Sequence, residues 1–155
     1  MPGQDWQAVL APPSMRELRE RLRVLEARHE ELHLLGGAMI RRFRGGYPDA
    51  PVYLVKYASR SLSEYRWRRR SGLHWGDVER RWGNVTLDLT SPQGQALLER
   101  FSLGVRQDWL QWEGWRVELN LALSTCTYER YRLRDYVERK RRMREMQDEW
   151  AGRPK

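Results

Sequence analysis

The stretch Glu64–Trp75, EYRWRRRSGLHW, places four arginines and three aromatic residues within twelve positions. A guanidinium group binds phosphate oxygens through paired hydrogen bonds, and an exposed aromatic ring stacks on nucleic-acid bases. These residue types therefore suit a surface that binds nucleic acid. A sheet packed against helices uses the same types, with its aromatic residues facing the core and its long cations facing water. The stretch alone is compatible with both interpretations.

Two basic segments form the candidate site. Period-two alternation along an extended segment sets Arg66 and Arg68 on one face and Tyr65, Trp67 and Arg69 on the other. Tyr65 and Trp67 are candidates for base stacking, although core packing is the favoured role for Trp67. The basic residues assigned to the site are Lys56, Arg60, Arg66, Arg68, Arg69 and Arg70 on a hairpin, and Arg139, Lys140, Arg141, Arg142 and Arg144 on a distal helix.

The distribution of charge supports these two segments. The 155 residues carry a formal charge of +8, and lysine supplies only three of the 29 basic residues. A GC-rich genome also favours arginine over lysine, but it would spread the excess evenly. By segment, residues 51–85 carry a net +5 and residues 129–155 a net +4, whereas residues 86–128 carry a net −2. This uneven distribution favours a basic binding surface.

The order of helix and strand signals along the chain predicts an α+β fold: a small antiparallel sheet of about three strands packed against an N-terminal helix and a long C-terminal helix. Ser14 and Glu17 have the spacing of a capping box that opens the first helix, and Gly36-Gly37 would thin or break it. The strand candidates are rich in β-branched and aromatic residues. They are Val52–Ala58, Leu62–Arg69 and Asn84–Leu89, and the segment Gly72–Trp82 reads as a wide loop or a short helix from Asp77.

A second helix is predicted from Ser91-Pro92 through Phe101, with Gly104 ending it, and the long helix from Val105 to Trp150. We expect a single domain over residues 1–155. Residues 1–13 would form a flexible lead, and residues 138–155 a projecting basic helical tail.

Each long helix has an apolar seam with alternating four- and three-residue spacing. The second seam includes two arginines, Arg116 and Arg130. A buried arginine needs a carboxylate partner, for which Glu26 and Glu30 are candidates, or a route to solvent; phosphate binding would require both arginines to be exposed. The seams are Leu18, Leu22, Leu25, His29, Leu32, Gly36, Met39 and Phe43, and Val105, Trp109, Trp112, Arg116, Leu119, Leu123, Cys126, Arg130, Leu133 and Val137.

No catalytic motif accompanies these elements, and we expect a protein that is not an enzyme and holds no metal or cofactor. His29 and His33 are spaced for one helical face but lack a third ligand, and Cys126 lies on an apolar seam. One alternative is a metal-dependent nuclease whose site is assembled from residues distant in sequence. Its candidates are Glu64, His74, Asp77, Glu79 and Asp88.

Four short motifs occur in a fixed order: Pro51-Val-Tyr-Leu54, Ser59-Arg-Ser-Leu-Ser63, Tyr65-Arg-Trp-Arg68 and Trp115-Arg-Val-Glu-Leu-Asn120. In outline, over about residues 50–135, this order resembles small uncharacterised proteins of bacterial integrative and conjugative elements. The resemblance implies an accessory role on a mobile element and supplies no catalytic residues.

The sequence therefore predicts a cytoplasmic, non-enzymatic protein that binds nucleic acid, with DNA as the first candidate, and has no membrane role. A single cysteine and the absence of an apolar run of membrane-spanning length motivate the expected location. The alternative is a helical interaction module that pairs with another protein or forms a homodimer. Its docking stripe would be Tyr136, Met143 and Trp150, which are spaced by seven.

Overall fold

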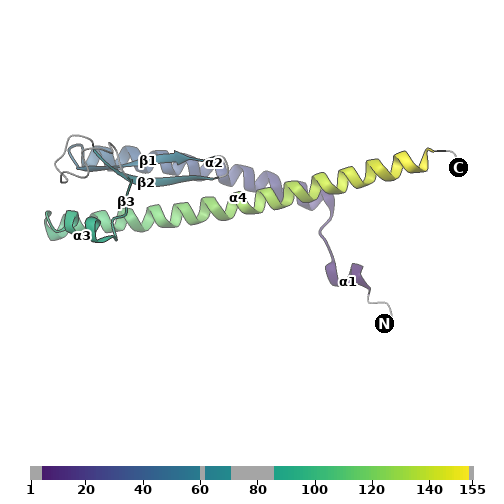
Figure 1. Ribbon diagram of the computed structural model, residues 1–155, viewed down its shortest axis with the longest axis horizontal. Helices are drawn as coiled ribbons and strands as arrows, with labels where there is room; N and C mark the ends of the chain where they lie inside the picture. The colour runs from purple at the N-terminus through teal and green to yellow at the C-terminus, as the bar shows by residue number, and fades with distance from the viewer. Residues whose placement is uncertain (1–4, 60–61, 71–85, 154–155) are drawn as a thin grey trace. The chain divides into compact units, whose positions relative to one another are not determined.

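The computed structural model describes residues 5–59, 62–70 and 86–153 and contains four helices and three strands within these ranges (Figure 1). The antiparallel sheet, the N-terminal helix and the long C-terminal helix confirm the predicted α+β fold. The segment Gly72–Trp82, predicted as a loop or short helix, lies outside the described residues. In chain order the elements are α1 (Trp6–Leu10), α2 (Met15–Gly46), β1 (Val52–Ala58), β2 (Ser63–Arg69), β3 (Thr86–Leu87), α3 (Pro92–Leu98) and α4 (Leu103–Ala151).

The chain divides into two compact units, and α2 and α4 contribute to both. The sheet unit comprises His29–Thr125 and includes the three strands and α3. The helical unit comprises Met1–Arg28 and Cys126–Lys155, and it includes α1 and the first part of α2 together with the last part of α4.

The predicted capping box opens α2. The backbone N–H of Glu17 donates to Ser14 Oγ at 3.2 Å, and the N–H of Ser14 donates to Glu17 Oε2 at 2.7 Å. The helix then continues through Gly36-Gly37 to Gly46, so the expected thinning or break is wrong. Gly36 is there for packing, since a Cβ at this position would lie 2.1 Å from Cζ of Tyr65.

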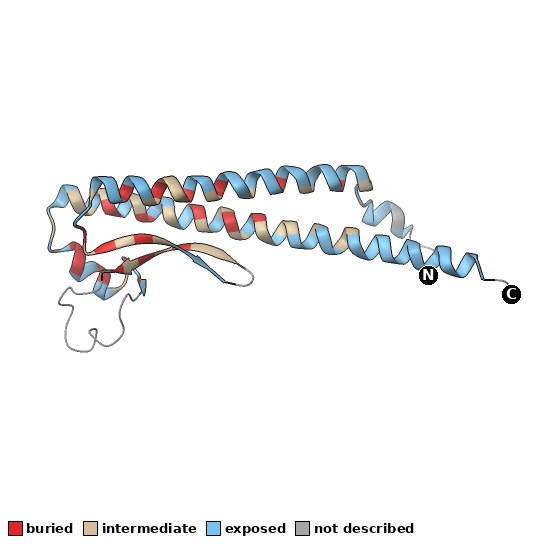
Figure 2. Ribbon diagram, turned by 90° about the horizontal axis from the view of Figure 1, so that it is seen from above, coloured by how far each residue is buried: buried red, intermediate tan, exposed pale blue. Residues whose placement is uncertain are grey.

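The sheet has the order β1-β2-β3, with both neighbouring pairs antiparallel. β1 has the predicted bounds and β2 begins one residue later than predicted, whereas the described part of β3 is only Thr86–Leu87. Buried and partly buried residues alternate over residues 52–55 of β1 and residues 64–69 of β2 (Figure 2), as expected when one face of a sheet packs on a core, whereas the last three residues of β1 are exposed.

Helix α3 begins as predicted and ends earlier. Ser91 is its N-cap, and the Gly94 N–H donates to Ser91 Oγ at 3.1 Å, with Pro92 at the first helical position. The helix ends at Leu98 rather than Phe101. Gly104 was expected to end it but lies inside the first turn of α4, because Ser102 caps α4 two residues upstream of Gly104.

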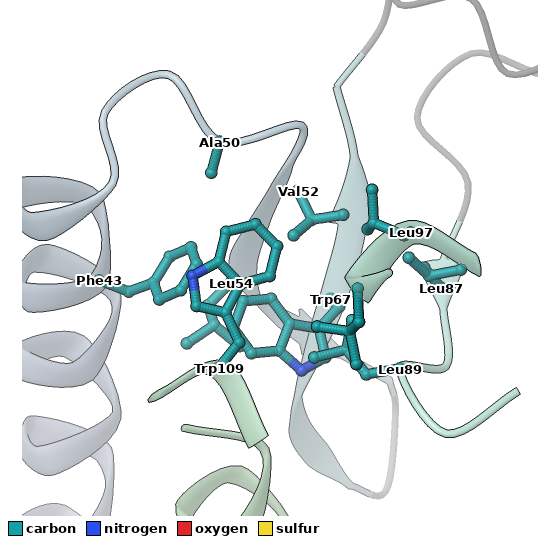
Figure 3. Close-up of a cluster of buried hydrophobic side chains, with 10 residues drawn as sticks. Phe43, Ala50, Val52, Leu54, Trp67, Leu87, Leu89, Leu97 and Trp109 are labelled. Carbon is teal, nitrogen blue, oxygen red and sulfur yellow. The ribbon is translucent and has the colours of Figure 1, made fainter. Parts of the chain in front are cut away.

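The core of the sheet unit joins the sheet to α2, α3 and α4 (Figure 3). Phe43 of α2 lies with its ring centroid 4.8 Å from that of Trp67 and 5.6 Å from that of Trp109. Both contacts are edge-on, the geometry that aromatic pairs prefer. The cluster consists of Phe43, Ala50, Val52, Leu54, Trp67, Leu87, Leu89, Leu97, Leu98 and Trp109.

The helical unit has a simpler core, in which α2 and α4 pack along the two predicted seams. Leu18, Leu25 and Cys126 are buried there. The Cys126 thiol donates to the backbone oxygen of Leu25 at 3.2 Å, and burial raises the pKa of this thiol. Ion pairs of Arg21 with Glu129 at 2.7 Å and of Arg134 with Glu26 at 2.5 Å flank the seam. The two seams, read from spacing alone, are confirmed as the buried faces.

Candidate nucleic-acid interface

The register of the hairpin assigns each strand residue to a face of the sheet. Tyr53 pairs with Arg68, Val55 with Arg66 and Tyr57 with Glu64, and directly paired residues share a face. This set lies opposite the core residues Leu54 and Trp67, so it faces away from the core. We call it, together with the next residue of the same alternation, the outer hairpin face: Tyr53, Val55, Tyr57, Glu64, Arg66, Arg68 and Arg70.

Arg66 is held on the outer hairpin face by two neighbours. Its Nε donates to Glu64 Oε1 at 2.5 Å, and its guanidinium carbon lies 4.1 Å from the ring centroid of Tyr57. The half-exposed pair offsets part of the charge of Arg66 while leaving its guanidinium stacked on an aromatic face.

Arg70 is held by uncharged acceptors, and no carboxylate in the described part of the chain pairs with it. Its Nε donates to the Ala50 oxygen at 2.7 Å and its Nη2 to the Pro48 oxygen at 2.9 Å. The guanidinium carbon lies 5.9 Å from the ring centroid of Tyr53. A guanidinium has five N–H donors, so these two hydrogen bonds leave three for a ligand.

Of the three arginines on the outer hairpin face, Arg68 makes the fewest side-chain interactions with described residues. It is half-buried, lies directly opposite Tyr53, and makes no ion pair or hydrogen bond through its side chain with any described residue. Arg68 and Arg70 thus place two charges beside one tyrosine without an ion-pair partner among the described residues, whereas Glu64, the carboxylate of the outer hairpin face, pairs with Arg66.

The structure corrects three assignments to the candidate site. Tyr65 and Trp67 retain only 2% and 1% of their exposure and therefore present no ring face for base stacking. This burial confirms core packing as the role of Trp67. Arg69 is also buried, because it occupies the same core-facing alternation and pairs with Val52. Lys56 is exposed and pairs with Tyr65, on the sheet face opposite to Arg66 and Arg68, as the alternation predicted. Arg60 lies outside the described residues.

Sequence reasoning missed the two tyrosines that share the outer hairpin face. Tyr57 is exposed and Tyr53 partly so. The alternation Tyr53, Val55, Tyr57 is visible in the strand itself, but only the register with β2 sets these residues beside arginines.

The arginine on the α4 seam has a partner on its own helix. Arg116 donates through Nε and Nη2 to the two carboxylate oxygens of Glu113, each at 2.7 Å, and through Nη1 to the Tyr65 oxygen at 2.9 Å. The Glu113 carboxylate raises the pKa of Arg116. Glu113 is buried and also accepts from Trp67 Nε1 at 2.6 Å. This pairing replaces the expected partners Glu26 and Glu30, and it occupies Arg116 internally.

Asn120 completes the same network by acting as a strand partner. Its Oδ1 accepts from the Tyr65 N–H at 2.8 Å, and its Nδ2 donates to the Tyr65 oxygen at 2.9 Å. The described pairing of β3 with β2 involves only Trp67 and Arg68 of β2 and does not reach Tyr65. The Asn120 side chain takes the place of a neighbouring strand for the Tyr65 N–H and carbonyl. Buried backbone groups need such partners, and Asn120 supplies both.

In the distal part of α4, which was predicted as the second basic segment, arginines form ion pairs with neighbouring carboxylates. Arg139 pairs with Asp135 at 2.9 Å, and Arg141 pairs with both Glu138 and Glu145 at 2.5 Å. Arg141 lowers the pKa of Glu138. Lys140 lies 6.0 Å from the ring centroid of Tyr136. The remaining assigned cations, Arg142 and Arg144, are exposed.

Arg130, the other seam arginine, is half-buried, and its Nε is buried without a hydrogen-bond partner among the described residues. Arg130 is therefore not fully exposed, as phosphate binding would require, and its Nε makes no hydrogen bond with the described residues.

Other chemistry finds little support in the described part of the chain. Those residues contain no group of three His, Cys, Asp or Glu side chains that could hold a metal ion. His29 and His33 pack ring against ring at 4.5 Å, and His33 lies beside the hydroxyl of buried Tyr65. Of the dispersed nuclease candidates, Asp88 accepts hydrogen bonds from Thr90, which lower its pKa, and Glu64 pairs with Arg66. The other three, His74, Asp77 and Glu79, lie outside the described residues.

Comparisons with protein-family models, with curated proteins and with solved structures find no match to this chain. Among the helices within the described ranges, none has the length and apolar character that a membrane span requires.

Proposed function

We propose that the protein is a non-enzymatic nucleic-acid-binding accessory protein, with DNA as its first candidate ligand and the outer hairpin face as its contact surface. The observation that carries the proposal is the placement of Arg68 and Arg70 beside Tyr53, with neither charge offset by a described carboxylate. A cytoplasmic setting and a role on a mobile element belong to the same proposal, and the order of the four sequence motifs supports them.

The chemistry of this face suits a phosphate backbone better than a base edge. Arginine pairs with phosphate oxygens whatever the sequence, and tyrosine rings add stacking that tolerates every base. Arg70 is fixed by the Ala50 and Pro48 oxygens, so little side-chain entropy is lost when it binds. We expect binding that depends on salt and only weakly on sequence.

The test is the affinity of the full-length protein for a fluorescent DNA duplex and a single strand, measured over a range of salt concentrations. Arg68→Glu with Arg70→Glu should weaken binding and reduce the slope of log affinity against log salt by about 0.9 per lost duplex phosphate contact. Arg23→Glu is the control for a single charge reversal on another element, and its loss is compared per reversed charge, since Arg23 is exposed on α2 and pairs with Glu20. Binding that ignores salt, or equal losses for Arg23→Glu, would contradict the proposal.

The distal helix contributes to the proposal independently. Arg142→Glu with Arg144→Glu tests it, since neither residue takes part in the Arg141 ion pairs with Glu138 and Glu145. A further fall in affinity assigns the distal segment to the interface. Unchanged affinity restricts the interface to the hairpin.

A second candidate function, self-association through α4, is favoured by a separate observation. Within the sheet unit, α4 has an exposed apolar stripe on the side opposite its buried seam: Leu103, Leu110, Val117 and Leu121, with Gly114 in line. The spacing is that of a helix-pairing seam, and no neighbouring atom lies within 4 Å of a Cβ built at Gly114.

We assign this stripe to a second copy of the chain in antiparallel orientation. Such pairing sets Leu110 against Leu121 of the other copy, and Gln111 against Glu118, so no like charges face each other. Leu121→Glu should convert a dimer into a monomer in light scattering, and Leu34→Glu, at an exposed position of α2, should not. A wild-type protein that is monomeric at all concentrations would rule out this second function.

A further inference from the structure

Two apolar faces of the helical unit remain uncovered. On α1, the side chains of Trp6, Val9 and Leu10 are between 64% and 71% exposed and share one helical face. On the last part of α4, those of Met143, Met146 and Trp150 are between 41% and 59% exposed and also share one face. We call the second set the distal stripe; Figure 2 shows this end of α4 as exposed.

The register of α2 against α4 determines where the chain before α2 can reach. Leu25 contacts Cys126 and Arg21 contacts Glu129, so the two helices run antiparallel. In both pairs the number of the α2 residue and that of the α4 residue at the same level sum to about 150. Continuing this register places Met15 opposite Tyr136. The chain that precedes Met15 therefore approaches α4 on the C-terminal side of Tyr136.

The length of the connection matches the distance to the distal stripe. The four residues 11–14, of which two are proline, span about 12 Å when extended, and α1 adds about 7 Å at 1.5 Å per residue. Laid along α4, α1 would cover the interval about 12–20 Å beyond Tyr136. By the same rise, Met143 lies about 10 Å and Trp150 about 21 Å beyond Tyr136.

The backbone of the linker between α1 and α2 is strained at one residue. Ala11 has φ of 31°, the only positive φ of a non-glycine residue in the described chain, and it precedes Pro12, which disfavours helical conformations at the residue before it. Moving Ala11 to an extended conformation would relieve the strain and change the direction of α1.

We propose that α1 is a strap that folds back on its own chain and covers the distal stripe. Trp6, Val9 and Leu10 then pack on Met143, Met146 and Trp150, and the free energy of covering these side chains maintains the closed state. A partner that uses the distal stripe must first displace α1, which makes the strap an autoinhibitory contact. This device is independent of nucleic-acid binding by the hairpin.

The test is disulfide formation in the full-length double variant Val9→Cys with Met146→Cys. The buried Cys126 thiol, whose pKa is raised, remains as a spectator. The control is Val9→Cys with Asp148→Cys, because residue 148 lies at nearly the same level of α4 but on its opposite side. We expect an intramolecular bond to form on the order of tenfold faster in the first variant, because the strap raises the local thiol concentration.

A third variant, which adds Leu10→Glu to the first pair, should slow the reaction to the control rate, since it removes the apolar contact without changing the linker. Equal rates in the first two variants, or a bond that forms only between two molecules, would overturn the proposal. All substituted positions are exposed, so each variant keeps the buried core intact.

Discussion

The sheet unit and the helical unit each contain an arginine–glutamate pair with nitrogen and oxygen 2.7 Å apart, but in different surroundings. Arg116 and Glu113 in the sheet unit keep 18% and 8% of their side-chain exposure, whereas Arg21 and Glu129 in the helical unit keep 51% and 37%. The buried pair also binds Trp67 and the Tyr65 backbone, but the exposed pair binds only its two members.

The distance between two charges therefore does not by itself determine their contribution to stability. In an exposed pair, water and salt screen the attraction and the net contribution is small. In a buried network, removal of one member leaves the others desolvated and unpaired, which is costly. The sheet unit therefore depends on Glu113, and the helical unit depends on its apolar seam more than on its ion pairs.

The largest expected effect comes from Glu113→Ala. The substitution strands the Arg116 guanidinium and the Trp67 Nε1–H in a buried site, and should lower the free energy of unfolding by about 3–5 kcal/mol. Urea denaturation followed by circular dichroism measures the change. Glu129→Ala is the matched substitution in the helical unit and should have little effect. Similar losses for both variants would abolish the contrast between the units.

Two glycine substitutions test packing in the sheet unit. Gly36→Ala should destabilise by about 1–3 kcal/mol, because its Cβ would collide with the Tyr65 ring, whose movement is restricted by burial. Gly114→Ala should instead stabilise by up to about 1 kcal/mol, because nothing surrounds its Cβ and alanine favours the helix. Thermal unfolding compares the two, and an equal sign for both would contradict the packing role of Gly36.

The helical unit offers a smaller, local effect at its capping box. Ser14→Ala removes the oxygen that accepts from the Glu17 N–H and should cost about 1 kcal/mol. Hydrogen exchange in the first turn of α2 measures the loss where it arises. Ser14→Asp keeps an acceptor oxygen and should retain the protection, so equal exchange in both variants would argue against the cap.

The smallest expected effect is a change with pH at Tyr65. Burial raises the pKa of its hydroxyl above the ordinary value of 10.0, so the unfolded chain loses this proton first as pH rises. The contribution of this group is fully present below pH 10.0 and is lost as pH rises through the folded pKa. Tyr65→Phe should flatten the fall of stability in alkaline urea titrations, whereas an unchanged slope would show that the group plays no part.

Features of the fold that depend on residues close together in sequence were predicted best. The capping box at Ser14, the N-cap at Ser91 and the bounds of β1 depend on residues within a few positions of one another, and the sequence located them. The end of α3 was misplaced because the Ser102 cap of α4 competes with the Gly104 signal.

The candidate site was only partly predictable, because alternation identifies two faces but leaves open what covers each. Four neighbouring arginines of β2 and its end, all assigned to the surface, have four different environments: Arg66 pairs with Glu64, Arg68 has no described side-chain partner, Arg69 is buried and Arg70 binds backbone oxygens.

Most of the elements, the two apolar seams and the uneven distribution of basic charge follow from the amino-acid sequence alone, because periodicity and composition act locally along the chain. Which charges are neutralised depends on the folded chain, since neutralisation requires strand register and contacts between residues far apart in sequence. The two motifs Tyr65-Arg-Trp-Arg68 and Trp115-Arg-Val-Glu-Leu-Asn120 illustrate this. They meet through Tyr65, Arg116 and Asn120, about 50 positions apart, and no local pattern contains that contact.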